Sequence, residues 1–355
     1  MKRLDEQATI DRAYGQDIIQ LFPEGMYPEQ LTHTYLPERV SETGKQIPID
    51  QVHSIIEEVK QERISAYEKS TGIKFNSLTL GKDIVEVRNG FLEHPAFREA
   101  VTLLGVDFDE AKPFINLPWW NEKGVGESKC EINPQERTVH LTFVPSHSLE
   151  TQLTRAGFDL SVKPSAVDGI ILAKPDNESQ KGYVTLGVRG GASYPNTYHL
   201  MATGALRASS RFKEGKENIY DLFRRDELLK ELGDVADTKI NRVIPFAKVK
   251  DYIINKGGST YLFIVETDLT KEEIRGVWEK NDSPDKKEFS EIFFIPANKN
   301  AINDFLNKNY RGIIENRYDR KDNERYLINP GAVDLCAFGG ISPAELKTFY
   351  RLGKW

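Results

Sequence analysis

The sequence predicts an α/β protein in which helices pack on a mixed sheet, preceded by an N-terminal α+β extension. Three observations lead to this class. Short apolar runs bounded by glycine and polar turns fill the middle of the chain, as strands do. One acidic helical segment, at about residues 216–232, lies among them. Strands and helices do not alternate regularly, which argues against a doubly wound βαβ fold.

The predicted strands cover much of residues 138–296. In the first, 138–146, apolar residues alternate with polar ones, the period of a half-buried strand. Residues 166–174 and 183–191 are apolar runs on either side of a polar, glycine-containing turn, which predicts a hairpin. Further strands are expected at 198–204, 241–253, 259–269 and 288–296.

An arm and two helices are predicted before this strand-rich region. Residues 1 to about 45 are punctuated by proline and lack periodicity, which is typical of an extended arm wrapping a folded body. Apolar residues recur at helical spacing within 48–72, with Gly72 as the C-terminal stop. A second, shorter helix is expected at 94–106.

The C-terminal tail carries the signals of a helix start. Ser342 is the expected N-cap, Pro343 the first helical residue, and Glu345 closes a capping box. A chain of 355 residues is long enough for more than one domain. We expect an accessory α+β region, a sheet domain and a C-terminal extension that packs on the sheet domain. Their ranges are 1–160, 161–300 and 301–355.

The composition is that of an ordinary soluble globular protein, with 39% hydrophobic and 29% charged residues and a net charge of -6. This balance predicts neither a nucleic-acid surface nor a membrane partner. Cys130 and Cys336 are far apart and the six histidines are scattered, so neither a disulfide framework nor a zinc site is expected. The N-terminal residues lack the apolar core of a signal peptide, and a cytoplasmic location is therefore expected.

Two carboxylates of the acidic helix point to a metal. Glu227 and Glu231 stand four residues apart and therefore project from one face. Like charges at this spacing destabilise an isolated helix, unless a divalent cation lies between them. Carboxylate oxygens suit Mg²⁺ or Mn²⁺. The alternative is an ordinary solvated helix, in which Arg224 pairs with Glu227.

The run from Val167 to Gly233 resembles the Nudix hydrolase family, whose signature is G-x5-E-x7-R-E-U-x-E-E-x-G-U, with U an apolar residue. Gly204 matches the first glycine, and "DELLKELG" matches the second half of the signature. There, Glu227 falls on the Glu of R-E, Glu231 on the last Glu, and Gly233 on the closing glycine. The resemblance covers about residues 160–300. It implies a Nudix-like α/β/α sandwich with a mixed sheet, and a loop-helix-loop that binds Mg²⁺ and hydrolyses a nucleoside diphosphate derivative.

The chain departs from this signature in the helix. Asp226 holds the arginine position, with Arg225 directly before it, and Lys230 replaces the first Glu of the E-E pair. A lysine there can pair with phosphate as a point charge. Asp234 replaces the terminal apolar residue.

The loop before the helix also departs from the signature. Gly204 and Gly233 are 29 residues apart, where the signature needs 21, so the segment between them contains an insertion of about eight. The early signature Glu has no fixed match as a result. Glu214 or Glu217 can take its place.

Further candidates lie outside the helix. The family often supplies another Glu from beyond the helix, and Glu266, Glu288 and Glu291 are the choices as ligand or general base. Arg189, with the Gly190-Gly191 turn, can help to hold a phosphate, although an ordinary hairpin turn explains it equally. The candidate metal ligands are Glu227, Glu231 and Glu217; the catalytic residues are Glu227, Glu231 and Glu291; and the substrate-binding residues are Arg189, Tyr194 and Lys230.

Two aromatic and histidine features favour structural roles. The Trp119-Trp120 pair is either a ligand-stacking platform or, by preference, two aromatics that fill a seam between domains. His199 is expected to be structural rather than catalytic.

Two hypotheses involve a nucleotide, and a third is a purely structural or interaction protein in which the whole acidic helix is solvated. The first is a Nudix-type hydrolase that cleaves the diphosphate of a nucleoside diphosphate derivative with Mg²⁺ or Mn²⁺. The second is a catalytically impaired Nudix-fold protein that binds a nucleotide as a sensor or scaffold, which Asp226 and Lys230 favour. In both, the partner is a small molecule, no nucleic acid or membrane is expected, and a homodimer is one assembly considered.

Overall fold

The structure is a computed structural model, and it describes most of the chain. The described residues are 19–41, 44–75, 84–155, 158, 160, 162–177, 181–190, 196–251, 258–281, 289–309, 326–327 and 329–341. The helix predicted from Ser342 lies outside them. No helix within the described ranges is long and apolar enough to cross a membrane.

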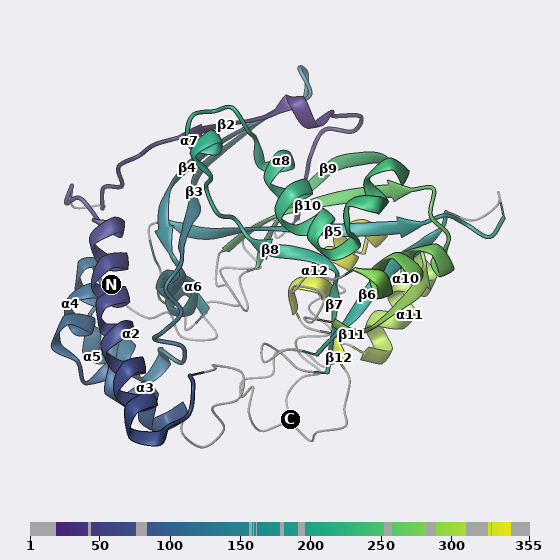
Figure 1. Ribbon diagram of the computed structural model, residues 1–355. Coiled ribbons are helices and arrows are strands. Elements are labelled where there is room, and N and C mark those ends of the chain that lie inside the picture. Colours follow the sequence, from purple (N-terminus) through teal and green to yellow (C-terminus); the bar gives the residue numbers. More distant parts are fainter. Residues whose placement is uncertain are drawn as a thin grey trace.

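A large mixed sheet forms the centre of the molecule (Figure 1). Its main path runs β1-β9-β10-β5-β3-β4-β2, and β6, β7, β8, β11 and β12 pair off this path. The strand bounds are β1 Ile19–Leu21, β2 Leu31–Tyr35, β3 Lys123–Asn133, β4 Thr138–His147, β5 Lys163–Ala173, β6 Tyr183–Arg189, β7 Thr197–Leu200, β8 Ala202–Ala205, β9 Ile240–Asp251, β10 Gly258–Thr267, β11 Phe289–Pro296 and β12 Tyr326–Leu327. Within the described residues, the strands predicted from apolar runs are confirmed, except that the strand expected at 198–204 is two strands, β7 and β8, separated at Met201.

The mixed character is clearest at β10, which runs parallel to β5 and antiparallel to β9. Nearly every residue of β10 is buried, as expected for a strand that is covered on both faces. Alternate residues contribute to different cores: Tyr261 and Phe263 to one, Leu262 to the other. The predicted α/β class with a mixed sheet is therefore confirmed.

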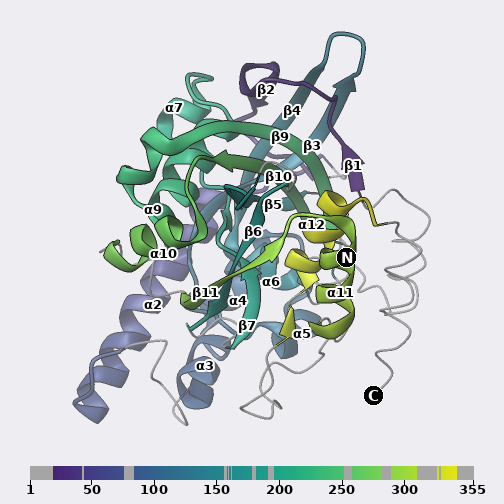
Figure 2. The ribbon, with the colours of Figure 1, turned by 90° about the vertical axis from the view of Figure 1, so that its right-hand side faces the viewer.

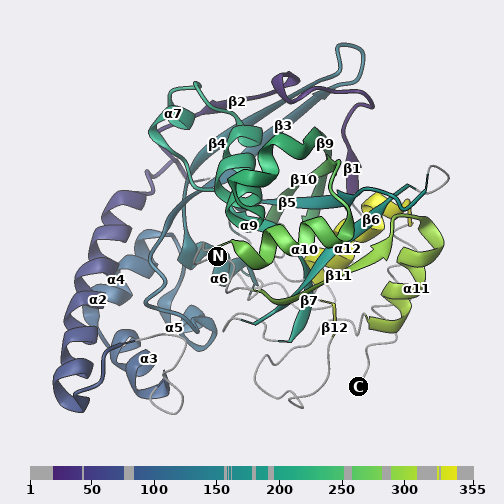
Figure 3. The ribbon, with the colours of Figure 1, turned by 45° about the vertical axis from the view of Figure 1, so that its right-hand side comes forward.

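Helices cover both faces of this sheet (Figures 2 and 3). On one face, Leu228, Leu232, Ile274 and Trp278 pack with the inward residues of β5 and β10. On the other face, α11 and α12 supply the helical half of a second core. The helix bounds in the C-terminal half are α7 Ser210–Lys213, α8 Ile219–Phe223, α9 Leu229–Leu232, α10 Lys271–Lys280, α11 Lys299–Asn309 and α12 Asn329–Gly339.

A third hydrophobic core lies in the N-terminal half, among helices that precede or follow the β3-β4 hairpin. Their bounds are α2 Ile49–Thr71, α3 Ile84–Leu92, α4 Pro95–Leu103, α5 Phe108–Ala111 and α6 Ser148–Arg155. The predicted helix at 48–72 is confirmed, and Gly72 ends it with a φ of 70°. The helix predicted at 94–106 is confirmed as α4.

The N-terminal arm joins the sheet at two edges. β1 pairs antiparallel with β9, and β2 pairs parallel with β4. Both pairings use the backbone of an extended chain. The expectation of an extended arm is therefore confirmed for its described part.

The hairpin predicted around residues 174–182 is present but short. β5 and β6 pair antiparallel only through Leu172–Val184 and Ala173–Tyr183. β6 pairs with β11 from Tyr183 to Arg189, and with β7 from Leu186 to Val188. The turn requires Gly182, whose φ is 91° and whose added Cβ would lie 2.4 Å from the carbonyl oxygen of Ala173.

Candidate functional site

The acidic segment forms one helical stretch in three parts. α8 is followed by a π-helical turn, η4 (Arg224–Leu228), and then by α9. Asn218 caps the start, with its side chain accepting from the Asp221 N–H at 3.1 Å. Gly233, with a φ of 79°, ends the stretch. The predicted helix at 216–232 is confirmed, except that its middle is wound as a π turn.

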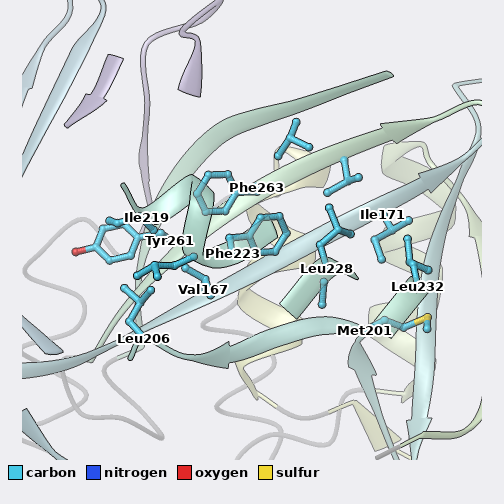
Figure 4. Packing of buried hydrophobic residues seen from close by; sticks show 14 of the residues in the cluster. Val167, Ile171, Met201, Leu206, Ile219, Phe223, Leu228, Leu232, Tyr261 and Phe263 are labelled. Carbon is cyan, nitrogen blue, oxygen red and sulfur yellow. The ribbon is translucent and has the colours of Figure 1, made fainter. Parts of the chain in front are cut away.

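The apolar face of this stretch packs on the sheet (Figure 4). Phe223 stacks on Phe263 of β10, with ring centroids 4.6 Å apart and planes 8° from parallel. Gly169 of β5 lies beneath it, because a Cβ there would approach the Phe223 ring to 2.4 Å. Leu228 and Leu232 are fully buried. These apolar contacts anchor the helix on β5 and β10 and so fix the backbone that carries its polar residues.

Glu227 lies directly against Gly204. A Cβ added to Gly204 would fall 2.0 Å from Glu227 Oε1, so the carboxylate occupies the space where any other residue would carry its side chain. Gly204 belongs to β8, which pairs with β5 through Val167. The Glu227 side chain is half-buried rather than directed into bulk solvent. Two positions that are 23 residues apart in sequence thus meet.

Glu231 is buried, with 3% of its surface exposed. The helix end around it is closed by Asn281, whose side-chain amide donates to the carbonyl oxygens of Lys230 at 2.6 Å and of Glu231 at 2.9 Å. Lys230 itself is exposed. The last turn therefore presents a cation to solvent and a carboxylate to the interior.

Glu217 is held by three neighbours. Its carboxylate accepts from the Ser209 hydroxyl at 2.7 Å and from Arg225 Nη1 at 2.9 Å, and it forms an ion pair with Arg211 at 3.1 Å. The Ser209 hydrogen bond, followed by Arg225 and Arg211, lowers the pKa of this carboxyl. Glu217 is thus an ionised, structurally engaged acid.

Arg225 joins two acids of the segment. Besides Glu217, it donates through Nε and Nη2 to Asp226, at 2.8 Å each, and these contacts raise the pKa of its guanidinium. Arg224, the alternative partner of Glu227, instead donates to Asp237 at 2.6 and 3.0 Å. Arg225 was expected only as a neighbour of the arginine position, and the contacts of Ser209 and Arg211 with Glu217 were not predicted. The available signal was the spacing of eight between Glu217 and Arg225, which is that of E-x7-R in the signature.

A cation site requires several oxygen ligands that converge. Within the residues that the structure describes, no group of three or more His, Cys, Asp or Glu side chains lies close enough to hold a metal ion. Glu217 is engaged as described, which leaves Glu227 and Glu231 on one packed stretch. Mg²⁺ is commonly held by one or two carboxylates together with phosphate oxygens. A cage formed by described protein side chains alone is therefore absent, and Glu227 and Glu231 stay the metal ligands that the sequence predicts.

The remaining candidates lie elsewhere on the sheet. Arg189 ends β6 and lies over the ring of Phe289, 5.8 Å from its centroid. Glu291 is exposed on the neighbouring β11, opposite Val188. Arg189 and Glu291 are thus close in the sheet, on strands other than β8. Glu266 is half-buried on β10.

Other candidate positions fall outside the described residues or have structural environments. Tyr194, Gly191 and Glu288 lie outside them. Glu214 is exposed and pairs with Lys216 at 2.6 Å. His199 is buried, and burial lowers its pKa to about 3, with Arg189 adding to the shift, so the ring is neutral.

Neither a protein-family model nor a curated protein matches the chain. One solved structure that it resembles is a bifunctional NMN adenylyltransferase/ADP ribose pyrophosphatase from Francisella tularensis, with 10% sequence identity and a TM-score of 0.22. The likeness covers 38% of this chain and 33% of that one, so the chain spans about a third of that protein. A likeness this weak does not identify a function.

Proposed function

We propose that the chain is a Nudix-type protein that binds a nucleoside diphosphate derivative and has largely lost the capacity to hydrolyse it. The observation that carries the proposal is the contact between Gly204 and Glu227. These residues match the first glycine and a central Glu of the signature. Their contact supports a loop and a helix that act as one site.

The spacing of the helix supports the same interpretation. Glu217 and Arg225 are eight residues apart, as E-x7-R requires, and Glu227 and Gly233 are six apart, as the second half requires. In the signature the Arg and the next Glu are adjacent, whereas in this chain Asp226 separates Arg225 from Glu227. A π turn accommodates one residue more than an α turn, and η4 contains Asp226. Asp226 is thus explained as a single insertion in an otherwise matching helix.

The loss of hydrolysis follows from the charges. Cleavage of a diphosphate requires metal ions that neutralise the developing charge and generate a hydroxide nucleophile. Glu217 is engaged by Arg225 and Arg211, and Lys230 replaces another carboxylate. Glu227 and Glu231 would remain to hold Mg²⁺ or Mn²⁺, which would neutralise phosphate charge when bound. Lys230 would add a direct contact to phosphate.

A second candidate function is hydrolysis itself, at a rate set by the two remaining carboxylates. It is favoured by the burial of Glu231 and the packed position of Glu227, since solvated surface carboxylates would show neither. Water would attack one phosphorus of the diphosphate and release a nucleoside monophosphate. The choice between the two functions is a question of rate.

Calorimetry with ADP-ribose and UDP-glucose, with and without Mg²⁺, tests binding, and release of the monophosphate tests turnover. We expect saturable, Mg²⁺-dependent binding with turnover near background. Glu231→Gln should remove the Mg²⁺ dependence, whereas Glu272→Gln, at an exposed position of α10, should not. Wild-type turnover that Glu231→Gln abolishes would favour the second candidate. Absence of binding to either compound would contradict both.

A gain-of-function test addresses the cause of the loss. Deletion of Asp226 makes Arg225 and Glu227 adjacent, as the R-E of the signature requires. Lys230→Glu restores the missing carboxylate. If the proposal is correct, the combined variant should hydrolyse a ligand that the wild type binds at least about tenfold faster, because metal binding recovers. Each change alone is the control. A folded combined variant that binds the ligand and Mg²⁺ but shows no gain would contradict this account of the impairment.

A further inference from the structure

The acidic helix ends beside a neighbouring helix. α9 is only one turn long, Leu229–Leu232, and follows the π turn η4 directly. The last four carbonyl groups of a helix have no partner within it, so a single last turn needs donors from side chains or water. α10 lies beside α9 (Figures 2 and 3), and Asn281, the residue that caps the C-terminus of α10, supplies such donors.

The side-chain amide of Asn281 bridges two residues of the last turn. Its Nδ2 donates to the carbonyl oxygen of Lys230 at 2.6 Å and to that of Glu231 at 2.9 Å. An amide NH2 group carries two hydrogens, one for each carbonyl, and because carbonyls only accept, the orientation of the amide is determined. The side chain also lies against Gly233, since a Cβ added there would fall 3.7 Å from Asn281 Cγ.

Asn281 is itself held by α10. Its backbone N–H donates to the Trp278 carbonyl at 3.2 Å, and Trp278 and Ile274 are buried in the core that α10 shares with β5 and β10. The other end of α10 is closed by a capping box between Thr270 and Glu273. The amide therefore reaches α9 from a packed support, and it ties the rotation of the last turn to α10.

The two residues that Asn281 holds are those whose side chains the proposed site uses. Lys230 is exposed and Glu231 is 3% exposed, so one turn directs a cation to solvent and a carboxylate to the interior. Successive residues of an α-helix are about 100° apart, so a rotation of the turn would move both side chains together. A helix C-terminus also carries partial negative charge, which disfavours a carboxylate there. Donation by Asn281 offsets this charge at both carbonyls.

We propose that Asn281 is a positioning residue of the site described above, and that it acts through the backbone of Lys230 and Glu231. In this role it contacts neither ligand nor metal. By fixing the rotation of the last turn, it keeps the Glu231 carboxylate in place for Mg²⁺ or Mn²⁺ and Lys230 in place for phosphate. The inference rests on the proposed function, to which it adds a residue from outside the signature segment.

Two asparagines cap the same helical stretch at opposite ends and provide a matched comparison. Asn281 binds its end, whereas Asn218 accepts from the Asp221 N–H at its start. Hydrogen exchange of the metal-free full chain is the first measurement. Asn281→Asp replaces the donors by an acceptor of the same shape. It should speed exchange of the Gly233 N–H, which donates to the Leu229 carbonyl at 2.7 Å, by at least about tenfold, whereas Asn218→Ala should not.

Calorimetry with ADP-ribose and UDP-glucose, with and without Mg²⁺, is the second measurement. Asn281→Asp should weaken Mg²⁺-dependent binding by about 10–100-fold, as the loss of support for a metal ligand does. Asn281→Ala, which removes the donors without adding a charge, should act in the same direction. Asn218→Ala should leave this affinity unchanged although it also removes a cap. Arg275→Gln, which removes a cation on α10, is a further control and should also leave it unchanged.

The outcomes separate this inference from the function on which it rests. Faster exchange in the Asn281 variants without weaker binding, or equal weakening by Asn218→Ala, would make Asn281 a structural cap only, while the proposed function would stand. Unchanged exchange at Gly233 would also overturn the inference. Absence of Mg²⁺-dependent binding in the wild type would contradict the function as well. Thermal melting shows which variants are folded, and Asn281→Ala decides where Asn281→Asp is not.

Discussion

Two glutamate–arginine pairs in this molecule differ sharply in environment. In the acidic helix, Glu217 and Arg225 are eight residues apart and 12% and 46% exposed. Arg39 and Glu150 are 111 residues apart and almost fully buried, at 2% and 0%, with Nη1 and Oε1 2.6 Å apart. The first pair lies where a ligand and solvent can compete for its charges. The second is sealed between the N-terminal arm and α6.

The difference shows which polar contacts can serve function and which hold the fold. A buried charge cannot lose its partner without exposing an uncompensated ion to the interior, so Arg39 and Glu150 form a fixed joint. Glu150 is further fixed because its Oε2 accepts from the His147 N–H at 3.0 Å. The Glu217–Arg225 pair is only partly buried, so solvent reaches Arg225 and the pair can be rearranged at a smaller cost than the buried one. We therefore expect ligand-dependent changes in the helix and none at the buried joint.

The largest expected effect is at the buried pair. Glu150→Gln should lower the free energy of unfolding by about 3–5 kcal/mol, because Arg39 would be left charged and buried. Chemical denaturation monitored by circular dichroism measures this loss. The double variant Arg39→Met/Glu150→Leu removes both charges and should recover much of it. A loss below about 1 kcal/mol for Glu150→Gln would show that solvent reaches the Arg39–Glu150 pair, and would contradict its description as a buried pair.

The next effect is acid destabilisation that originates in buried histidines rather than in the helix. Burial lowers the pKa of His147 to about 3, with His53 adding to the shift, and its Nε2 lies 2.8 Å from Asn121 Oδ1. Unfolded histidine titrates at 6.5, so the unfolded state takes up protons that the native state does not. Stability is therefore complete above pH 6.5 and falls as the pH drops from 6.5 toward 3.

Each such histidine contributes up to about 1.4 kcal/mol per pH unit within this window, and His199 acts in the same direction. The pKa of Glu217 is also lowered, but its effect begins only below its unfolded value of 4.5. Denaturation midpoints between pH 7.5 and 5 therefore isolate the histidines. His147→Gln should reduce the slope in this range. An unchanged slope would assign the acid sensitivity to other groups.

A medium effect is expected where the loop meets the helix. In Gly204→Ala, the new methyl would overlap the Glu227 carboxylate, and unfolding free energy should fall by about 1–3 kcal/mol. Glu227→Ala in the same chain removes the overlap and should restore part of the loss. Gly276→Ala in α10 is the control, since no atom lies within 4 Å of its added Cβ, and it should be neutral or stabilising. Equal effects at both glycines would mean that Glu227 does not occupy this space.

Local periodicity predicted only part of the regular structure, since each signal lies within one element. Most strands from β4 to β11 and the helix ended by Gly72 were found in this way, whereas β3 and helices α3, α6, α10 and α11 were not predicted. α12 was missed because its run of glycine, proline and apolar residues shows no amphipathic period, and a helix buried all round needs none. The tail helix and Tyr194 lie outside the described residues and stay predictions.

Contacts between distant segments were not predictable from the chain. Glu127, Lys248 and Tyr261 look unremarkable in sequence, yet Glu127 of β3 accepts from Lys248 of β9 and Tyr261 of β10, where β3 pairs with β5. Arg39 and Glu150 likewise look like surface residues. The π turn can be recognised from the spacing of apolar residues. Phe223 and Leu228 are five residues apart and both buried, whereas an α-helix would place them on different sides. That spacing indicates one extra residue between Phe223 and Leu228, within the π turn.

The smallest stability effect, and the most informative for function, is expected for Arg225→Gln. Solvent screens this half-exposed guanidinium, and Arg211 still pairs with Glu217, so the loss should stay below about 1 kcal/mol and shrink further in high salt. The substitution leaves Glu217 and Asp226 without the cation that they share. A Mn²⁺ titration followed by thermal shift should then show a larger stabilisation than in the wild type, whereas Arg275→Gln should not. If Mn²⁺ stabilises the variant no more than the wild type, Arg225 is not what keeps these carboxylates from binding a cation. The Glu217–Arg225 pair would then not be exchangeable for a ligand.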